Sequence, residues 1–348
     1  MTDIWNCLKN TKKPIVLYGT GNGADKVYAR LSADGVQISG VFSSAGFKKG
    51  RTFYGHSVRE YAELKAELGE MIILVCFGTD REDVIQNIIA LGREQELYVP
   101  DVPVHGEEIF DTRFARQNAD KLRAVYGMLS DEKSKKVFEN TVYFKLTGNL
   151  QYLFEIETDA GEENALLNLG KGERFLDLGA FTGDTVAEFI NAAGGGYDGI
   201  MAVEPDRRNF RKLCENVGGS NVITVNAAVG ERVGTMFLSK QHGRGIGGTE
   251  KSVEVDLTTI DTLARNFAPT YIKMDVEGSE MAAIAGGQST IKTLKPKLKI
   301  ACYHNSYDLF EIPLAVKDTV GEYGVYLRHR RSLPAWDTDY IFKITDKR

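Results

Sequence analysis

Two acidic residues stand directly after short apolar runs, at points where the chain passes from a strand into a turn. Asp177 lies in FLDLGAFTGDT (175–185), and Asp275 lies in YIKMDVEGSE (271–280). Gly179 and Gly183 follow the first acid. Glycine lets the backbone come close to a ligand, and the helix that follows offers free N–H groups to an anionic ligand group. The alternative is a tight strand–helix turn that binds nothing.

A third acid ends another apolar run. Glu204 in AVEPD (202–206) lies 25 residues after Gly179, and in dinucleotide-binding folds an acid ~20 residues past the glycine turn accepts both ribose hydroxyls. Pro205 ends the strand. Asp206 either shares in binding or only caps the next helix. The small residues of NAAVG (226–230) leave room for a ring such as adenine.

His304 and Asn305 follow the apolar run that comes after the Asp275 segment. The carboxyl ends of parallel strands meet at one edge of a sheet, so we expect these residues beside Asp275. An imidazole can take a proton near neutral pH. His304 is therefore a candidate base with Asp275 as the group that orients it, although Asp275 is a candidate base as well. The alternative is that His304 only braces the loop.

Alternating strands and helices position these groups in two α/β units. Residues 1–105 contain strand, glycine turn (GTGNG, 19–23) and helix, and they predict a small Rossmann-like domain that folds alone. Residues 106–165 have helical periodicity and many charges, which predicts a helical connector with Ser130 or Asp131 as an N-cap. Residues 166–348 form the second α/β unit. The predicted strands are 14–18, 36–42, 71–77, 97–99, 175–178, 199–203, 222–225, 270–274, 297–302, 325–328 and 340–344, the last two as an antiparallel pair at one edge of the sheet. A hairpin of 236–238 and 253–255 is expected around the Gly-rich loop 242–248. The predicted helices include 58–68, 83–91, 184–193, 207–217, 279–286 and 314–320.

The glycine turn of the first unit could hold a nucleotide. However, Ser43 and Ser44 stand where NAD binding needs an acid, which favours a packing or substrate-presenting role. Lys48, Lys49 and Arg51 could meet a phosphate, although such runs are usually solvated surface.

The overall composition narrows the class of partner. The 348 residues carry a formal net charge of -5, so nucleic acid is not expected as the main partner. The four cysteines have no CxxC spacing, and the N-terminus lacks a signal-peptide apolar region. The longest apolar run, 71–77, is far shorter than the ~20 residues that span a bilayer. We expect a cytoplasmic protein without a membrane span; the oligomeric state, homo-oligomer included, stays open.

Taken together and in order, FLDLGAFTGDT, VEPD, NAAVG, TTIDTL, YIKMDVEGSE and YHNSYDLFEIP resemble the FkbM family of methyltransferases. The resemblance covers about residues 130–345 and implies a seven-stranded class I methyltransferase domain that uses S-adenosylmethionine (SAM). It also implies methylation of a hydroxyl on a sugar, glycan or secondary metabolite, with His304 and Asp275 as catalytic residues. Asn305 and Ser306 depart from the arginine or proline that often follows the family's histidine, so the substrate cannot be carried over. The implied cofactor-binding residues are Asp177, Gly179, Ala180, Phe181, Gly183, Asp184, Thr185, Glu204, Pro205, Asp206, Asn226, Ala227 and Asp275.

Other readings stay open. A metal-dependent small-molecule O-methyltransferase would use Asp275 with His304 and Asn305, but magnesium prefers oxygen ligands, so no metal is expected. A non-catalytic nucleotide-binding protein would keep the glycine turns and need no base. A dehydrogenase would need the acid that the first unit lacks.

Overall fold

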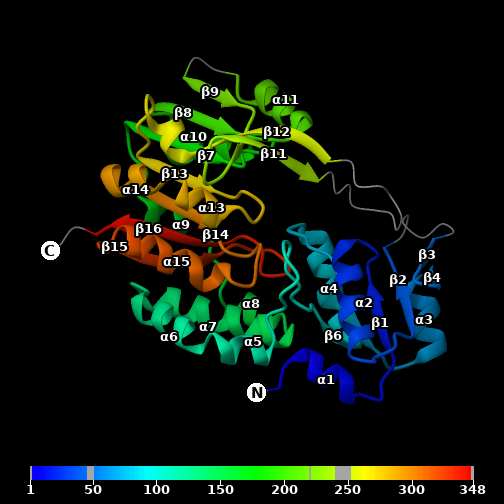
Figure 1. Cartoon of the computed structure of the whole chain (residues 1–348). Helices are drawn as coiled ribbons and strands as arrows, with labels where there is room; N and C mark the ends of the chain where they lie inside the picture. Colours follow the sequence, from blue (N-terminus) through cyan, green and yellow to red (C-terminus); the bar gives the residue numbers. More distant parts are fainter. Residues whose placement is uncertain (1, 45–50, 219–220, 240–251, 346–348) are drawn as a thin grey trace.

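The computed structural model describes residues 2–44, 51–218, 221–239 and 252–345. Two α/β units are joined by a group of helices that lies beneath the second unit in the view of Figure 1. Lys48, Lys49 and the predicted Gly-rich loop 242–248 lie outside the described residues.

The first unit has a sheet of order β3-β4-β2-β1-β5-β6 in which the strands pair in parallel, apart from the antiparallel β3. Parallel strands alternate with helices in this unit, which is an α/β arrangement. Its elements are α1 (Ile4–Asn10), β1 (Ile15–Tyr18), α2 (Asn22–Ala33), β2 (Gly40–Phe42), β3 (Thr52–Phe53), β4 (His56–Arg59), α3 (Tyr61–Leu68), β5 (Ile72–Val75), α4 (Glu82–Glu94) and β6 (Glu96–Tyr98).

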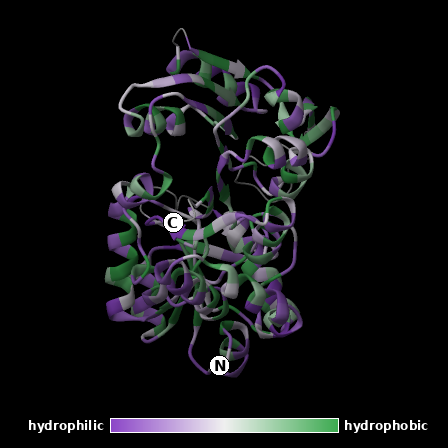
Figure 2. Ribbon diagram, turned by 90° about the vertical axis from the view of Figure 1, so that its left-hand side faces the viewer, coloured by the Kyte–Doolittle hydropathy of each residue, from purple (hydrophilic) through white to green (hydrophobic). Residues whose placement is uncertain are grey.

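Periodicity explains these elements. All four residues of β1 are buried, as in a strand covered on both faces. Helix α4 buries Ile85, Ile88 and Leu91 at a helical spacing and turns its charged residues outward. Figure 2 shows hydrophobic and hydrophilic residues interspersed along the helical ribbons in this way.

One predicted helix of this unit was too long. Residues 58–68 were expected to be helical throughout, but Val58 lies in β4 and pairs with Val41 of β2. The helix begins at Tyr61 because Glu60 and Glu63 form a reciprocal capping box there. A strand partner far away in sequence decided the structure of the first residues, and local periodicity could not reveal it.

The connector is helical, as predicted. Asp131 is the N-cap of the longest helix, since its side chain accepts a hydrogen bond from the Ser134 N–H. The helices are α5 (Thr112–Gln117), α6 (Ala119–Met128), α7 (Glu132–Thr147), α8 (Gln151–Phe154) and α9 (Ala160–Leu167).

The second unit has a seven-stranded sheet of order β15-β16-β14-β13-β7-β8-β9 in which β16 runs opposite to the other six strands. This is the predicted class I methyltransferase topology, with the antiparallel β15–β16 pair at one edge. The large-sheet strands are β7 (Glu173–Leu178), β8 (Tyr197–Val203), β9 (Val222–Val225), β13 (Tyr271–Met274), β14 (Lys297–Ala301), β15 (Tyr323–His329) and β16 (Thr338–Ile344).

A small sheet of order β10-β12-β11 stands beside the large one and contains the predicted hairpin. Its strands are β10 (Ala228–Val229), β11 (Gly234–Ser239) and β12 (Ser252–Thr258), and the helices of the second unit are α10 (Asp184–Ala192), α11 (Arg207–Asn216), α12 (Ile260–Ala264), α13 (Glu280–Ala285), α14 (Gln288–Leu294) and α15 (Asp308–Thr319).

The two units are in direct contact. Gly78 and Thr79 of the first unit meet the segment before β16: a Cβ on Gly78 would lie 2.1 Å from the ring of Trp336, and Thr79 exchanges two backbone hydrogen bonds with Leu333 (2.7 and 2.9 Å). Arg331 adds an ion pair to Glu82 of α4. None of the helices in the described part of the chain combines the length and apolar character needed to cross a membrane.

Candidate active site

A cavity of about 1450 Å³ opens at the carboxyl ends of the large sheet. Single small-molecule sites occupy ~300–1,000 Å³, so this cavity has room for two ligands. The strand ends are held in register beyond the strands themselves: Gly179 N donates to Val203 O, and Asp275 N donates to Leu178 O (both 3.0 Å). The predicted residues after β7, β8 and β13 therefore meet at one edge of the sheet.

Most predicted cofactor-binding residues line this cavity, and four do not. Asp177 and Ala180 are fully buried, Gly183 packs against α11, and the Asn226 amide donates to the carbonyls of Glu204 and Pro205. The predicted residues in the cavity wall are Gly179, Phe181, Asp184, Thr185, Glu204, Pro205, Asp206, Ala227 and Asp275.

Glu204 is fixed by the turn that follows β7. Its two carboxylate oxygens accept hydrogen bonds from the backbone N–H of Phe181 (3.0 Å) and of Asp206 (2.9 Å). Burial raises the pKa of Glu204, while these N–H groups act in the opposite direction. Asp206 also caps α11 by accepting from Arg208 N and Asn209 N. The carboxylate of Glu204 thus stands at the wall in one orientation.

Asp177 lies beneath the cavity. The Thr185 hydroxyl donates to one of its oxygens, and the other lies 3.9 Å from Lys273 Nζ without a hydrogen bond. Lys273 Nζ also lies 3.5 Å from Asp275. Burial alone would lower the pKa of Lys273, but the two carboxylates raise it. Asp177 therefore helps to hold the Lys273 ammonium in the cavity wall; the sequence interpretation had it face the ligand.

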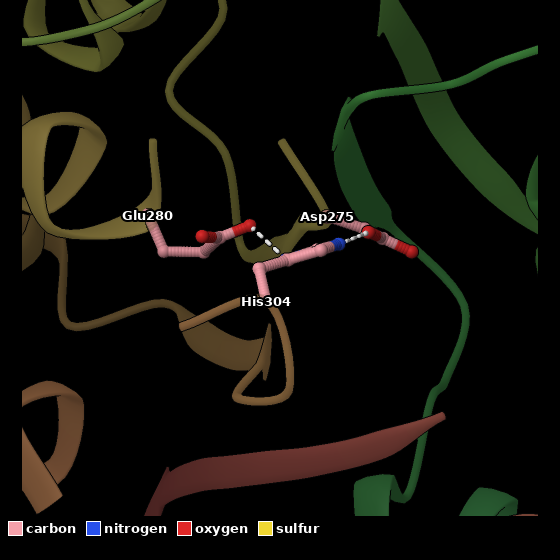
Figure 3. Close-up of side chains that lie close together, drawn as sticks. All are labelled: Asp275, Glu280 and His304. Atoms are coloured by element: carbon pink, nitrogen blue, oxygen red, sulfur yellow. Dashed lines mark ion pairs between the residues drawn. The ribbon is translucent and has the colours of Figure 1, made fainter. Parts of the chain in front are cut away.

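His304 lies between two carboxylates (Figure 3). Its Nδ1 forms an ion pair with Glu280 (2.9 Å), and its Nε2 lies 3.4 Å from Asp275. Glu280 is fully buried and accepts hydrogen bonds from the N–H groups of Val276 and Gly278. The predicted proximity of His304 and Asp275 is confirmed.

The charge state of His304 argues against the role of base. Burial would lower its pKa, but the carboxylates of Glu280, Asp275 and Glu277 raise it to about 9. The imidazole therefore carries a proton at neutral pH, and with 1% exposure it does not line the cavity. Asp275 lines the cavity, but Lys273 and His304 outweigh burial and lower its pKa, so it is a weak base. We infer from this charge and from the 3.4 Å distance between His304 Nε2 and Asp275 that His304 orients Asp275.

The same three residues resemble a metal-ligand set. Asp275, Glu280 and His304 each offer one ligand atom within 4.8 Å of the others. However, the two ring nitrogens of His304 face different carboxylates, which is the arrangement of a buried ion-pair array. The Asn305 amide faces Gly278 O and Asp308 and shows no contact with Asp275. The geometry does not favour the metal-dependent alternative.

Sequence reasoning missed several residues of the wall. The Tyr303 hydroxyl donates to both oxygens of Asp275 (3.2 Å each), and burial raises the pKa of Asp337 to about 6. The first unit contributes to the wall as well, through Asn22, Asp80, Val104 and His105. Lys273 and Tyr303 stand beside predicted residues in the same motifs, so spacing could have indicated them; the residues of the first unit gave no such signal.

The glycine turn of the first unit is closely packed. The ring of Phe77 lies 2.9 Å from the position that a Cβ would take on Gly19, and the Tyr18 hydroxyl is 2.7 Å from Ser44 Oγ. These contacts occupy the region after β1 and β2, which supports a packing role.

The residues at this edge of the sheet match a known protein family. A family model described as the methyltransferase FkbM domain matches residues 177–331, from the acid that follows Leu176 to the arginine that contacts α4. Residues 177–331 form a methyltransferase FkbM domain. The match begins at the end of β7 and contains β8, β13 and the residues after these strands that line the cavity, so this protein is a methyltransferase.

A solved structure extends the similarity to almost the whole methyltransferase. The FkbM methyltransferase of Methylobacillus flagellatus KT is 22% identical over 95% of this chain and 90% of its own, with a TM-score of 0.72. At this identity the likeness concerns the fold, and it includes the N-terminal unit. No curated protein matches the sequence.

Two more distant structures overlap with about half of the chain. Precorrin-6y C5,15-methyltransferase from Geobacter metallireducens GS-15 is 14% identical over 53% of this chain and 87% of its own, with a TM-score of 0.35. Fibrillarin from Aeropyrum pernix is 15% identical over 53% of this chain and 74% of its own, with a TM-score of 0.34.

Proposed function

We propose that this methyltransferase uses SAM to methylate a hydroxyl group of a sugar, glycan or secondary metabolite. The observation that carries the proposal is the common wall of one cavity: Glu204 after β8 and Asp275 after β13 both border it. SAM would supply an activated methyl group on a sulfonium. The protein therefore has to bind SAM and the acceptor, align them, and take the proton of the acceptor hydroxyl.

The residues of the wall fit such a donor. The fixed Glu204 carboxylate can accept hydrogen bonds from ribose hydroxyls, and Ala227 and Ala228 leave space for a planar ring. Gly179 keeps the turn close to the neighbouring strand, since a Cβ there would lie 1.8 Å from Asp275 O. The anionic Asp275, held by Lys273 and Tyr303, would face the cationic part of the donor.

The polar wall also fits a hydroxyl-rich acceptor. Asp80, Glu277 and Asp337 line the cavity, and carboxylates accept hydrogen bonds from hydroxyl groups. A cavity larger than one small molecule needs leaves room for that acceptor beside the donor.

Calorimetry of SAM binding tests the donor. Glu204→Gln should weaken SAM binding by roughly 1–3 kcal/mol, because one acceptor of charge-assisted hydrogen bonds is lost. Glu215→Gln is the matched control: Glu215 is exposed on α11 and does not line the cavity. Equal affinity in the two variants would refute the assignment.

The acceptor can be found by incubating the protein with isotopically labelled SAM and cell extract and identifying the labelled product by mass spectrometry. The expected product carries the label on an oxygen. A label found on nitrogen or carbon would contradict the hydroxyl acceptor.

A further inference from the structure

His105 comes from the segment that leaves the N-terminal sheet after β6, and it reaches the methyltransferase cavity. Its backbone N–H donates to the carbonyl of His304 (2.9 Å). Its ring lies over Gly278, where a Cβ would come within 2.8 Å of the ring atom Cγ. His105 is exposed at the cavity wall, to which Asp275 and Glu277 also belong, and the Glu277 carboxylate is close enough to influence its charge.

The segment that carries His105 is held from both sides. Lys26 of α2 donates from Nζ to the carbonyls of Pro103 (2.6 Å), Val104 (3.0 Å) and Gly106 (3.3 Å). On the other side, Ser306 Oγ donates to Glu108 O (2.5 Å). A segment of irregular backbone with this many directed contacts has a defined position, as a residue that acts on a substrate requires.

We propose that His105 is the general base of the methyl transfer, supplied to the site by the N-terminal unit. The inference rests on the proposed function, because it assumes a hydroxyl acceptor in the cavity. The acceptor hydroxyl would give its proton to a ring nitrogen of His105 while its oxygen forms the bond to the methyl carbon. The electron pair of the broken carbon–sulfur bond stays on sulfur as the thioether product leaves, and His105 ends as an imidazolium.

The charges around the two histidines support this division of roles. Burial and the positive charge of His304 lower the pKa of His105, with Lys26 acting in the same direction and Glu277 and Glu280 opposing it. The pKa of His304 is about 9. At neutral pH His304 keeps its proton and His105 has a free nitrogen. Environments that separate the pKa values of neighbouring groups are typical of acid–base sites.

Replacement of His105 tests the proposal. With labelled SAM and cell extract as probes, His105→Gln should lower the rate of label transfer by ~10²–10⁴-fold, the usual contribution of a positioned base. SAM affinity measured by calorimetry should stay unchanged, since the predicted SAM-binding residues belong to the other unit. His56→Gln is the matched control: His56 lies in β4 and not in the cavity wall, and its rate should be normal.

Two readouts separate a base from a structural role. Added imidazole should restore part of the rate in His105→Ala, and the wild-type rate should rise with pH through a pKa below 6.5, a limb that His105→Gln lacks. A normal rate in His105→Gln would overturn the inference and leave the proposed function standing. So would a loss of rate in Asp337→Asn with a normal rate in His105→Gln, because Asp337 also lines the cavity. Absence of SAM binding to the wild-type protein would instead refute the proposed function, and the inference with it.

Discussion

The two histidines at this site, His304 and His105, have imidazoles in different surroundings. His304 has a carboxylate at each ring nitrogen and is covered by protein. His105 stands at the cavity wall, where the positive charge of His304 lowers its pKa. Removing one partner from a buried ion-pair array leaves an uncompensated charge, which is costly. Such an array fixes Asp275 and the turn at Gly278, and therefore both walls between which the acceptor would lie.

Stability against pH reports the state of His304. Its pKa of about 9 in the folded protein lies above the ordinary ~6.5, so its stabilisation is complete below pH 6.5 and is lost as pH rises through 9. Glu280→Gln removes the carboxylate responsible and keeps an oxygen for the backbone N–H groups. The free energy of unfolding of the wild-type protein minus that of Glu280→Gln should be larger at pH 6 than at pH 9.5, by on the order of 3 kcal/mol. Urea unfolding of both proteins at the two pH values measures this change.

Comparing the wild-type protein with Glu280→Gln separates the titration of His304 from that of most other groups. The pKa values of about 6 at Asp308 and Asp337 affect stability mainly below this window. The buried thiol of Cys76 affects both proteins alike, since burial alone raises its pKa. Glu280 is only the last of the groups that raise the pKa of the Cys302 thiol, after burial and two aspartates. Glu277→Gln is the control, because its carboxylate lies 3.8 Å from His304 Nε2 but is 74% exposed and so contributes little. A difference between wild type and Glu280→Gln that is constant with pH would show that His304 is not the titrating group.

At the scale of elements, the strand ends carry the site. The sequence predicted the strands ending before Gly179, Glu204 and Asp275, because apolar runs followed by glycine, proline or acid are local signals. It also predicted the antiparallel pair at the sheet edge. It misjudged residues 58–60, where pairing with β2 overrides the helical pattern.

The parts that could not be predicted depend on distant contacts. Nothing in the local sequence indicates that Lys26 binds the carbonyls around His105, or that Glu280 lies against His304. The charge of His304 depends on distant contacts for the same reason. Its type and position suggested a base, but only the surrounding carboxylates determine its charge at neutral pH.

The turn after β7 permits a sharp test at this scale. Gly179 has φ +81°, and a Cβ there would lie 1.8 Å from the backbone oxygen of Asp275, which cannot move without the adjacent strand. Gly179→Ala should therefore destabilise the protein by roughly 3 kcal/mol or more and abolish SAM binding. Gly21→Ala is the matched control from the N-terminal glycine turn, since its Cβ would meet nothing within 4 Å. Thermal melting and calorimetry on both variants check this; a Gly179→Ala protein with normal melting and affinity would contradict the geometry.

At the scale of the whole molecule, the two units share one core and one cavity. A single cluster of buried side chains includes Val16 and Ile73 of the first sheet and Leu176 and Ile272 of the second. Asp101 and Lys145 form a buried ion pair (2.9 Å) between the first unit and the connector. The expectation that residues 1–105 fold alone was based on a complete set of elements. The shared core gives a physical reason for the opposite outcome, because the isolated fragment would expose apolar surface and an unpaired Asp101.

The contact of Trp336 with Gly78 should set how the two units meet around the cavity. A Cβ on Gly78 would lie 2.1 Å from the Trp336 ring, so Gly78→Ala must displace the ring and the loop that carries Asp337. Misplacement of catalytic groups by about 1 Å can cost ~10²-fold in rate. We expect a loss of that order in label transfer from SAM, with SAM affinity nearly unchanged.

Gly127 provides the matched substitution for Gly78. It lies in α6 with nothing within 4 Å of its Cβ position, so Gly127→Ala should keep the wild-type rate and slightly raise the melting temperature through its helix propensity. Protease cleavage between the units should become faster in Gly78→Ala and not in Gly127→Ala. If Gly78→Ala is cleaved faster but transfers methyl groups at the normal rate, the N-terminal unit contributes nothing to catalysis and the cavity works from the methyltransferase domain alone. A reduced rate at unchanged SAM affinity means that the orientation of the two units is part of the active site.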